Sequence, residues 1–238
     1  MLTLFASPPT CSAGRRPVSR GFGGAQRLQG PEFTRLFYSN PEKYGFAIQM
    51  TLHAQRAAAA SLVSDTIRVL DRSLIGDWAF ALWNRASGNL TETEWQVYLE
   101  RAGQAPKQLI SRFPANTIVL YLQDSPKHCH KRLELRNGVD AGVPLSYLQG
   151  LHAAHLIVLA FLPKSFRQVR VPWSVYSTIQ RFDDEFVEKI IMQAGERPID
   201  YFPILLKAAK AAIADIESQN AREFLEFQVK RLQSDADI

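Results

Sequence analysis

Residues 66–70, Thr-Ile-Arg-Val-Leu, form a short apolar segment that is followed at once by Asp71, Arg72 and Ser73. The segment has the length and the β-branched content of a strand. In open α/β sheets, ligands bind outside the carboxyl ends of the strands, which is where this acid–arginine pair falls. Asp71 can hold a cation or orient a hydroxyl group, and the permanent charge of Arg72 suits a phosphate or a developing oxyanion. The alternative is a salt bridge at the end of the strand, with Ser73 as the cap of the next helix.

Strands and helices alternate along the chain after residue 33. An almost continuously apolar strand is predicted at residues 117–122, as expected for a parallel strand that is buried on both faces. A third strand is predicted at residues 169–175, where Pro172 favours the edge of a sheet. Helical patterns lie between the strands, and a capping box at Thr91–Glu94 marks the start of one of them. This order predicts an α/β fold with a parallel sheet, right-handed crossovers and flanking helices.

The chain divides into three regions. Residues 1–32 form an irregular segment with four arginines, and its first 30 residues contain no acid. This composition fits an organelle transit peptide, an unstructured tail or a wrongly assigned gene start, so the expected compartment is the cytoplasm or the mitochondrion. Residues 33–200 hold the α/β domain, and residues 201–238 are predicted to form one long amphipathic helix after Pro203.

Composition excludes several classes of protein. A hydrophobic content of 46% with both signs of charge is typical of a globular domain, and the net charge of +5 is mild. We find no basic stripe that would require nucleic acid and no apolar run long enough to cross a bilayer. Cys11 and Cys129 give no disulfide framework. His128-Cys129-His130 is not predicted to bind metal, because adjacent residues of a helix point in different directions.

A polar stripe runs along the predicted helix that begins at Pro41. Phe46, Gln49, His53 and Arg56 recur at helical spacing and share one face. Such a stripe on an alanine-rich helix indicates either a face turned toward a polar ligand or a solvated face. The sequence leaves both open.

A second cluster of charge lies on the helix that begins at Ser125-Pro126. The cluster comprises Lys131, Arg132 and Arg136, and the helix is predicted to stop at Asn137-Gly138. Cations in a last helical turn complement the helix dipole. The functional alternative is a cationic flap over phosphate groups.

Five segments resemble, in order and spacing, the deoxynucleoside kinases that act on deoxycytidine, deoxyguanosine and deoxyadenosine. They are residues 36–49, the Asp71-Arg72-Ser73 tripeptide, residues 91–95, residues 118–126 and residues 142–152. The likeness covers about residues 33–190. It implies a P-loop-kinase type of α/β fold, ATP and Mg²⁺ as cofactors, nucleotide salvage as the process and a possible homodimer.

The resemblance also implies roles for residues on the nucleoside side of the site. Gln49 would read the edge of the base, Arg56 and Asp77 would pair beside it, and Phe80 would stack on it. Tyr38 would contact the sugar 3′-hydroxyl, joined by Asp140. Arg72 would lie by the 5′-hydroxyl.

On the phosphate side, Asp71 would help to hold Mg²⁺. Lys131, Arg132 and Arg136 would supply charge for the travelling phosphoryl group, as phosphoryl transfer requires. Gln180, Arg181 and Phe182 would lie near the adenine of ATP.

The sequence departs from the family at the phosphate side. No Gly-x-x-x-x-Gly-Lys-[Ser/Thr] loop occurs in the 238 residues, and the first lysine is Lys43. Residues 1–6 could form a strand, but residues 7–10 do not read as a phosphate loop. The general-base glutamate is also absent, since Glu32 is too close to Tyr38. Asp71 replaces a glutamate of the family. The lid, the segment that carries Lys131, Arg132 and Arg136, is one residue shorter than in the family.

The chain thus resembles the family on the nucleoside (acceptor) side of the site and departs from it on the ATP (donor) side. Three explanations are open. The locus could encode an active kinase with a further upstream exon, the chain could be a pseudokinase retained as a structural or assembly subunit, or it could bind nucleosides without phosphorylating them. We expect little or no kinase activity from these 238 residues. We also expect exposed sheet edges where the central phosphate strand is lacking.

Overall fold

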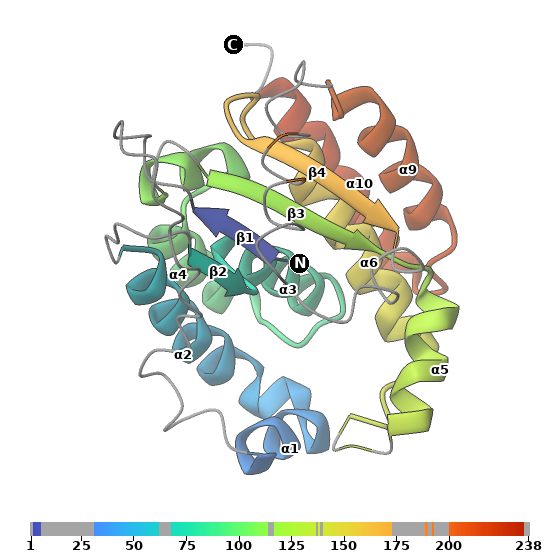
Figure 1. The fold of residues 1–238 in the computed structure, drawn as a ribbon. Coiled ribbons are helices and arrows are strands. Elements are labelled where there is room, and N and C mark those ends of the chain that lie inside the picture. Colours follow the sequence, from blue (N-terminus) through green and yellow to red (C-terminus); the bar gives the residue numbers. More distant parts are fainter. Residues whose placement is uncertain are drawn as a thin grey trace.

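The computed structural model describes residues 2–5, 31–61, 68–113, 117–136, 138, 140–172, 189, 192 and 200–235. Its sheet has four strands in the order β2-β1-β3-β4 (Figure 1). The strands are β1 (Leu2–Phe5), β2 (Arg68–Asp71), β3 (Thr117–Gln123) and β4 (Arg167–Pro172). β4 lies at an edge, as the proline predicts. A helix-rich α/β fold is therefore confirmed.

The direction of the first strand differs from the expectation of a parallel sheet. β3 and β4 are parallel, whereas β1 runs antiparallel to both of its neighbours. β2, β3 and β4 therefore share one direction, and β1 points the other way between them (Figure 1). The expectation of exposed sheet edges in place of the central phosphate strand is wrong, because β1 pairs with β2 on one side and with β3 on the other.

The register of β1 fixes where the chain leaves the sheet. Leu2 pairs with Asp71 and Leu120, and Phe5 pairs with Arg68 and Thr117. The carboxyl end of β1 therefore lies beside the amino ends of β2 and β3. A phosphate loop follows a parallel central strand and would begin at the end of the sheet where Asp71 lies. The chain leaves β1 at the opposite end of the sheet.

Nine α-helical and 3₁₀ segments in the described residues surround or follow this sheet. They are α1 (Pro31–Ser39), α2 (Pro41–Ser61), α3 (Leu74–Ala86), α4 (Glu92–Ala102), η2 (Pro106–Arg112), α5 (Pro126–Arg136), α6 (Leu145–Ala160), α9 (Phe202–Ala214) and α10 (Gln219–Ser234). Eleven of the thirteen residues of α3 are buried, so this helix forms the centre of the helical core. Any polar side chain on its inner faces must find a partner inside the protein.

Local signals in the sequence place the helix ends correctly. Ser73 caps α3 by accepting a hydrogen bond from the backbone NH of Ile75 at 3.3 Å. The capping box of Thr91 and Glu94 is present at the start of α4. α5 begins at Pro126 and ends at Arg136, just before the Asn-Gly pair. These ends are set by neighbours in sequence, which is why they are predictable.

The C-terminal region contains two helices instead of the one that was predicted. α9 ends at Ala214, and α10 begins at Gln219. Ser218 caps α10 with its side chain, which accepts from the NH of Ala221 at 3.4 Å. Ile216 between the helices is only 4% exposed. Burial of this side chain and the serine cap together favour a break over a continuous helix.

No helix within the described ranges has both the length and the apolar content that spanning a bilayer requires.

Candidate active site

Asp77, in the first turn of α3, is a fully buried carboxylate with four side-chain partners. Its Oδ1 accepts from Gln49 Nε2 at 2.9 Å and from an Arg56 guanidinium NH at 2.5 Å. Its Oδ2 lies 2.9 Å from His53 Nδ1 and accepts from the Tyr98 hydroxyl at 3.0 Å. Burying a charge is costly unless it is paired and hydrogen-bonded, and Asp77 is both. We refer to Asp77 with its four partners as the Asp77 cluster.

Three of the four partners come from the polar stripe of α2. Gln49, His53 and Arg56 are spaced four and three residues apart, so they lie on one helical face. That face is turned toward α3, and Gln49 and His53 are buried. The alternative of a solvated face is therefore wrong. The ion pair of Arg56 with Asp77 that the resemblance implies is present, with the two side chains 10% and 0% exposed.

Tyr98 is the partner that sequence reasoning missed. It lies on α4, 21 residues beyond Asp77, and no local pattern links the two positions. Burial, followed by the charge of Asp77, raises the pKa of Tyr98 well above its usual value. The hydroxyl therefore stays protonated and serves Asp77 as a donor.

The amide of Gln49 is engaged at both ends. Its Nε2 donates to the carboxylate and to the backbone carbonyl of Asp77, the latter at 3.1 Å. Its Oε1 accepts from Asn84 Nδ2 at 3.4 Å. To read the edge of a base, as the resemblance implies, Gln49 has to exchange one of these partners for the ligand.

Arg72 follows β2 in a left-handed backbone conformation, with φ of +63°. This conformation costs a residue with a side chain about 1–2 kcal/mol. The bend carries the guanidinium to 5.2 Å from the centre of the Phe80 ring. The Phe80 ring also meets the His155 ring edge-on, with the two ring centres 5.8 Å apart. Strained residues of this kind concentrate at functional sites. The side chain of Asp71, just before this bend, lies outside the described residues.

Tyr38, Asp140, Arg72 and Arg136 share one electrostatic neighbourhood. The pKa of Tyr38 is raised, first by burial and then by the charge of Asp140, while Arg72 and Arg136 oppose the shift. Arg136 forms an ion pair with Asp140 across the end of α5. These are four of the residues that the resemblance assigns to the sugar and the phosphate, and two of them, Arg136 and Asp140, are in contact.

Arg132 is engaged elsewhere. It pairs with Asp124, which lies between β3 and α5 and also contacts His128 at 3.1 Å. Burial alone would raise the pKa of Asp124, but hydrogen bonds from Arg132, the Ser125 backbone and His128 hold it below its usual value. Lys131 is exposed on the same helix. Lys131, Arg132 and Arg136 therefore do not converge on one point.

Less of the ATP side of the site than of the nucleoside side lies within the described residues. Gln180, Arg181 and Phe182 lie outside the described residues. In the part of the chain that the structure describes, no three His, Cys, Asp or Glu side chains form a group that could hold a metal ion. A magnesium ion that accompanies ATP takes one or two carboxylates from a protein and its other ligands from phosphate and water. The resemblance assigns one such carboxylate, that of Asp71.

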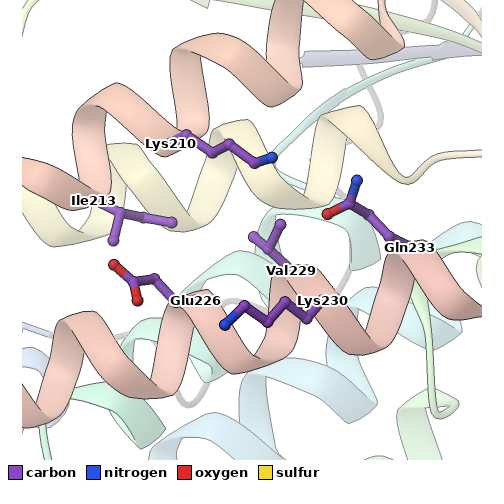
Figure 2. Close-up of a pocket in the computed structure, with 6 residues that line it drawn as sticks. All are labelled: Lys210, Ile213, Glu226, Val229, Lys230 and Gln233. Carbon is purple, nitrogen blue, oxygen red and sulfur yellow. The ribbon is translucent and has the colours of Figure 1, made fainter.

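A separate cavity of about 300 Å³ lies between α9 and α10. Figure 2 shows its lining residues, which are Lys210, Ile213, Glu226, Val229, Lys230 and Gln233. It shares no residue with the Asp77 cluster or with the Arg72 bend.

The fold and the Asp77 cluster define a helix-rich α/β protein with a buried polar site beyond the carboxyl end of β2. The model of the deoxynucleoside kinase family matches residues 18–196, so the chain belongs to this family. It is 32% identical over 126 residues to a deoxyguanosine kinase of Dictyostelium discoideum, a match that covers 50% of this chain and 43% of the relative.

Other relatives show a similar degree of likeness. A deoxyadenosine kinase of the same organism is 29% identical over 144 residues, covering 59% of this chain and 57% of the relative. Human deoxycytidine kinase is 29% identical over 136 residues, covering 53% and 52%. The chain therefore matches about half of the length of these relatives.

Proposed function

We propose that the protein binds a deoxynucleoside at the Asp77 cluster and that its reaction is the ATP-dependent phosphorylation of the 5′-hydroxyl. The observation that carries the proposal is the buried Arg56–Asp77 ion pair with Gln49 bonded to it. Five polar groups are held together here; four of them are buried, and the side chain of Arg56 is 10% exposed. A site of this kind discriminates strongly between ligands, because a wrong ligand leaves buried polar groups unpaired.

The base is recognised by amide and charged groups in this proposal. Gln49 offers one donor and one acceptor to the edge of a base, and Asp77 and Arg56 extend the pattern by one acceptor and one donor. Phe80 stacks on the ring. The relatives act on deoxyguanosine, deoxyadenosine and deoxycytidine by name, which supports a purine deoxynucleoside or deoxycytidine as the substrate.

The sugar and the reacting oxygen lie at the Arg72 bend. Tyr38 and Asp140 hold the 3′-hydroxyl, and Arg72 stands at the 5′-hydroxyl. Arg136 and Arg132 bring positive charge to the phosphate oxygens, whose charge spreads during transfer. Arg132 first has to leave Asp124 for this purpose.

ATP and Mg²⁺ belong to the same proposal. Asp71 supplies a carboxylate for the ion, and Gln180, Arg181 and Phe182 lie by the adenine. When bound, Mg²⁺ neutralises charge on the phosphates of ATP. The residues of this chain then hold the acceptor, orient its 5′-hydroxyl and exclude water from the base.

A second candidate is a family member that binds the nucleoside or keeps the fold for assembly without catalysis. Two observations favour it. The 238 residues contain no Gly-x-x-x-x-Gly-Lys-[Ser/Thr] sequence, and β1 runs opposite to the other three strands. Without backbone NH groups aimed at the phosphates, transfer would lack its main source of stabilisation.

One assay separates these candidates. The 238-residue chain is given γ-labelled ATP and Mg²⁺ with each of the four deoxynucleosides, and nucleoside binding is titrated in parallel. Labelled 5′-monophosphate from a purine deoxynucleoside or deoxycytidine supports catalysis. Binding without transfer supports the second candidate, because that is the outcome a degenerate donor side predicts. Neither binding nor transfer would overturn the proposal that the Asp77 cluster is a nucleoside site.

A further inference from the structure

His53 is a partner of Asp77 for which the family resemblance implies no role. Its Nδ1 lies 2.9 Å from Asp77 Oδ2, and its side chain is only 6% exposed. Its ring also meets the Tyr98 ring edge-on, with the ring centres 5.5 Å apart. It shares one face of α2 with Gln49 and Arg56, the two residues that we propose to face the base.

The four partners of Asp77 divide between its two oxygens. Gln49 and Arg56 donate to Oδ1, at 2.9 Å and 2.5 Å. His53 and Tyr98 contact Oδ2, at 2.9 Å and 3.0 Å. A carboxylate turns easily about its last side-chain bond, because that torsion has broad minima. Two donors on Oδ2 therefore fix the plane of the group, and with it the direction of Oδ1.

The contact requires His53 to be a donor. A carboxylate offers only acceptors, so the hydrogen of this bond is on the Nδ1 of His53. A neutral imidazole in that tautomer and a charged imidazole both donate from Nδ1. What His53 supplies to the Asp77 cluster is thus one N–H.

We propose that His53 is a positioning residue for base recognition, which holds Oδ2 of Asp77 and so keeps Oδ1 directed at Gln49 and Arg56. This inference rests on the proposed function and adds a residue that acts through Asp77 and not on the nucleoside itself. When Gln49 exchanges one of its partners for the base, Asp77 is still held at Oδ2. Groups that are held in place before binding lose less conformational freedom when the ligand arrives.

Two substitutions separate the N–H of His53 from the bulk of its ring. His53→Leu fills a similar space and has no donor. His53→Asn carries an amide NH₂ that can take the place of the Nδ1 N–H, although it lacks the rest of the ring. We expect His53→Asn to bind the nucleoside better than His53→Leu does, whereas a role in packing alone would favour leucine.

The readout is discrimination between bases, which a change in stability alone does not move. Affinity is measured for the deoxynucleoside that the wild type binds most tightly and for the matching unsubstituted deoxyriboside, that of purine or of 2-pyrimidinone. The unsubstituted base lacks the exocyclic group at C6 of a purine or at C4 of cytosine, which the Asp77 cluster would read. His53→Leu should bind the preferred deoxynucleoside about 5- to 10-fold more weakly, and the unsubstituted one as the wild type does. His53→Asn should keep the ratio of the two affinities within about 2-fold of the wild-type ratio.

A second variant and a control accompany these. Tyr98→Phe removes the other donor from Oδ2 and keeps the ring, so it should lower the ratio in the same direction. His152→Leu is the matched control, because His152 is a half-buried histidine of α6 whose pKa is lowered by burial and then by the charge of Arg170. Its affinities should equal those of the wild type.

Calorimetric titration of the full chain and its variants decides the matter. An unchanged ratio in His53→Leu, an equal loss of affinity for both deoxyribosides, or a ratio in His53→Asn no better than in His53→Leu would each overturn the inference while leaving the nucleoside site in place. If His53→Leu does not fold, an unchanged ratio in Tyr98→Phe overturns it. A wild type that binds no deoxynucleoside overturns the proposed function, and the inference with it.

Discussion

The guanidinium of Arg132 is paired with the carboxylate of Asp124, which stands between β3 and α5. The arginine that the family resemblance assigns to the phosphoryl group is thus held by an acid eight residues earlier in the chain. A guanidinium that is already neutralised offers less charge to a phosphate. This pair therefore bears on both the stability and the proposed chemistry of α5.

The Asp124–Arg132 pair predicts a pH dependence of stability. The pKa of Asp124 is lowered in the folded protein, so its contribution is present at neutral pH and is lost as pH falls through the folded value. Asp124→Asn should lower the melting temperature at pH 7 by a few degrees at most, since the pair is partly exposed. The difference should shrink below about pH 5.

Melting curves of the wild type and of Asp124→Asn between pH 7 and pH 3 check this. Arg132→Gln removes the same pair from its other side and should give the same dependence. A difference between wild type and variant that stays constant over that range would contradict the assignment.

The packing of α6 on α3 depends on a glycine. A Cβ placed on Gly150 would come within 2.1–2.3 Å of three ring atoms of Trp83. Gly150→Ala should therefore destabilise the protein by about 1–3 kcal/mol, which is measured by urea unfolding. Gly142→Ala is the control, because a Cβ there meets nothing within 4 Å. Equal stability of the two variants would show that the helices are not in this close contact.

The bend at Arg72 predicts an unusual order of stabilities. Glycine adopts a φ of +63° readily, whereas alanine does not. Arg72→Gly should be more stable than Arg72→Ala by about 1 kcal/mol, although both lose the contact with Phe80. In the proposed function both variants lose the guanidinium at the 5′-hydroxyl alike. If alanine were the more stable of the two in urea, the left-handed bend would be absent.

The Asp77 cluster predicts a large effect from a small change. Asp77→Asn leaves the buried charge of Arg56 without its counter-ion, which should cost about 3–5 kcal/mol in the free energy of unfolding. Asp200→Asn breaks an exposed pair with Lys164 and should change the free energy of unfolding far less. Adding Arg56→Gln to Asp77→Asn should restore part of the loss. A double variant less stable than the single one would contradict the pairing.

Much of the fold is predictable because its signals are local. The cap at Ser73 and the capping box at Thr91 and Glu94 depend on residues within one helical turn. The direction of β1 is different, because the four-residue segment Leu-Thr-Leu-Phe pairs as well in either direction. The direction of β1 is decided by its pairing with residues that lie more than 60 positions later in the chain.

The candidate site likewise has a part that the sequence predicts and a part that only the structure shows. The spacing along α2 predicts that Gln49, His53 and Arg56 share a face, but not that this face meets Asp77. The resemblance supplied the Arg56–Asp77 pair. Tyr98 came from the structure alone, since it reaches Asp77 from another helix. The roles of these residues toward a base and a sugar stay predictions.

The central claim is that the Asp77 cluster binds a deoxynucleoside, and calorimetric titration of the wild type and of Gln49→Ala tests it most directly. We predict that the wild type binds at least one of deoxyguanosine, deoxyadenosine and deoxycytidine. Gln49→Ala should bind that nucleoside at least about 10-fold more weakly. Gln96→Ala, which changes an exposed glutamine of α4, should bind it as the wild type does. Absence of binding by the wild type, or equal binding by Gln49→Ala, would contradict the account.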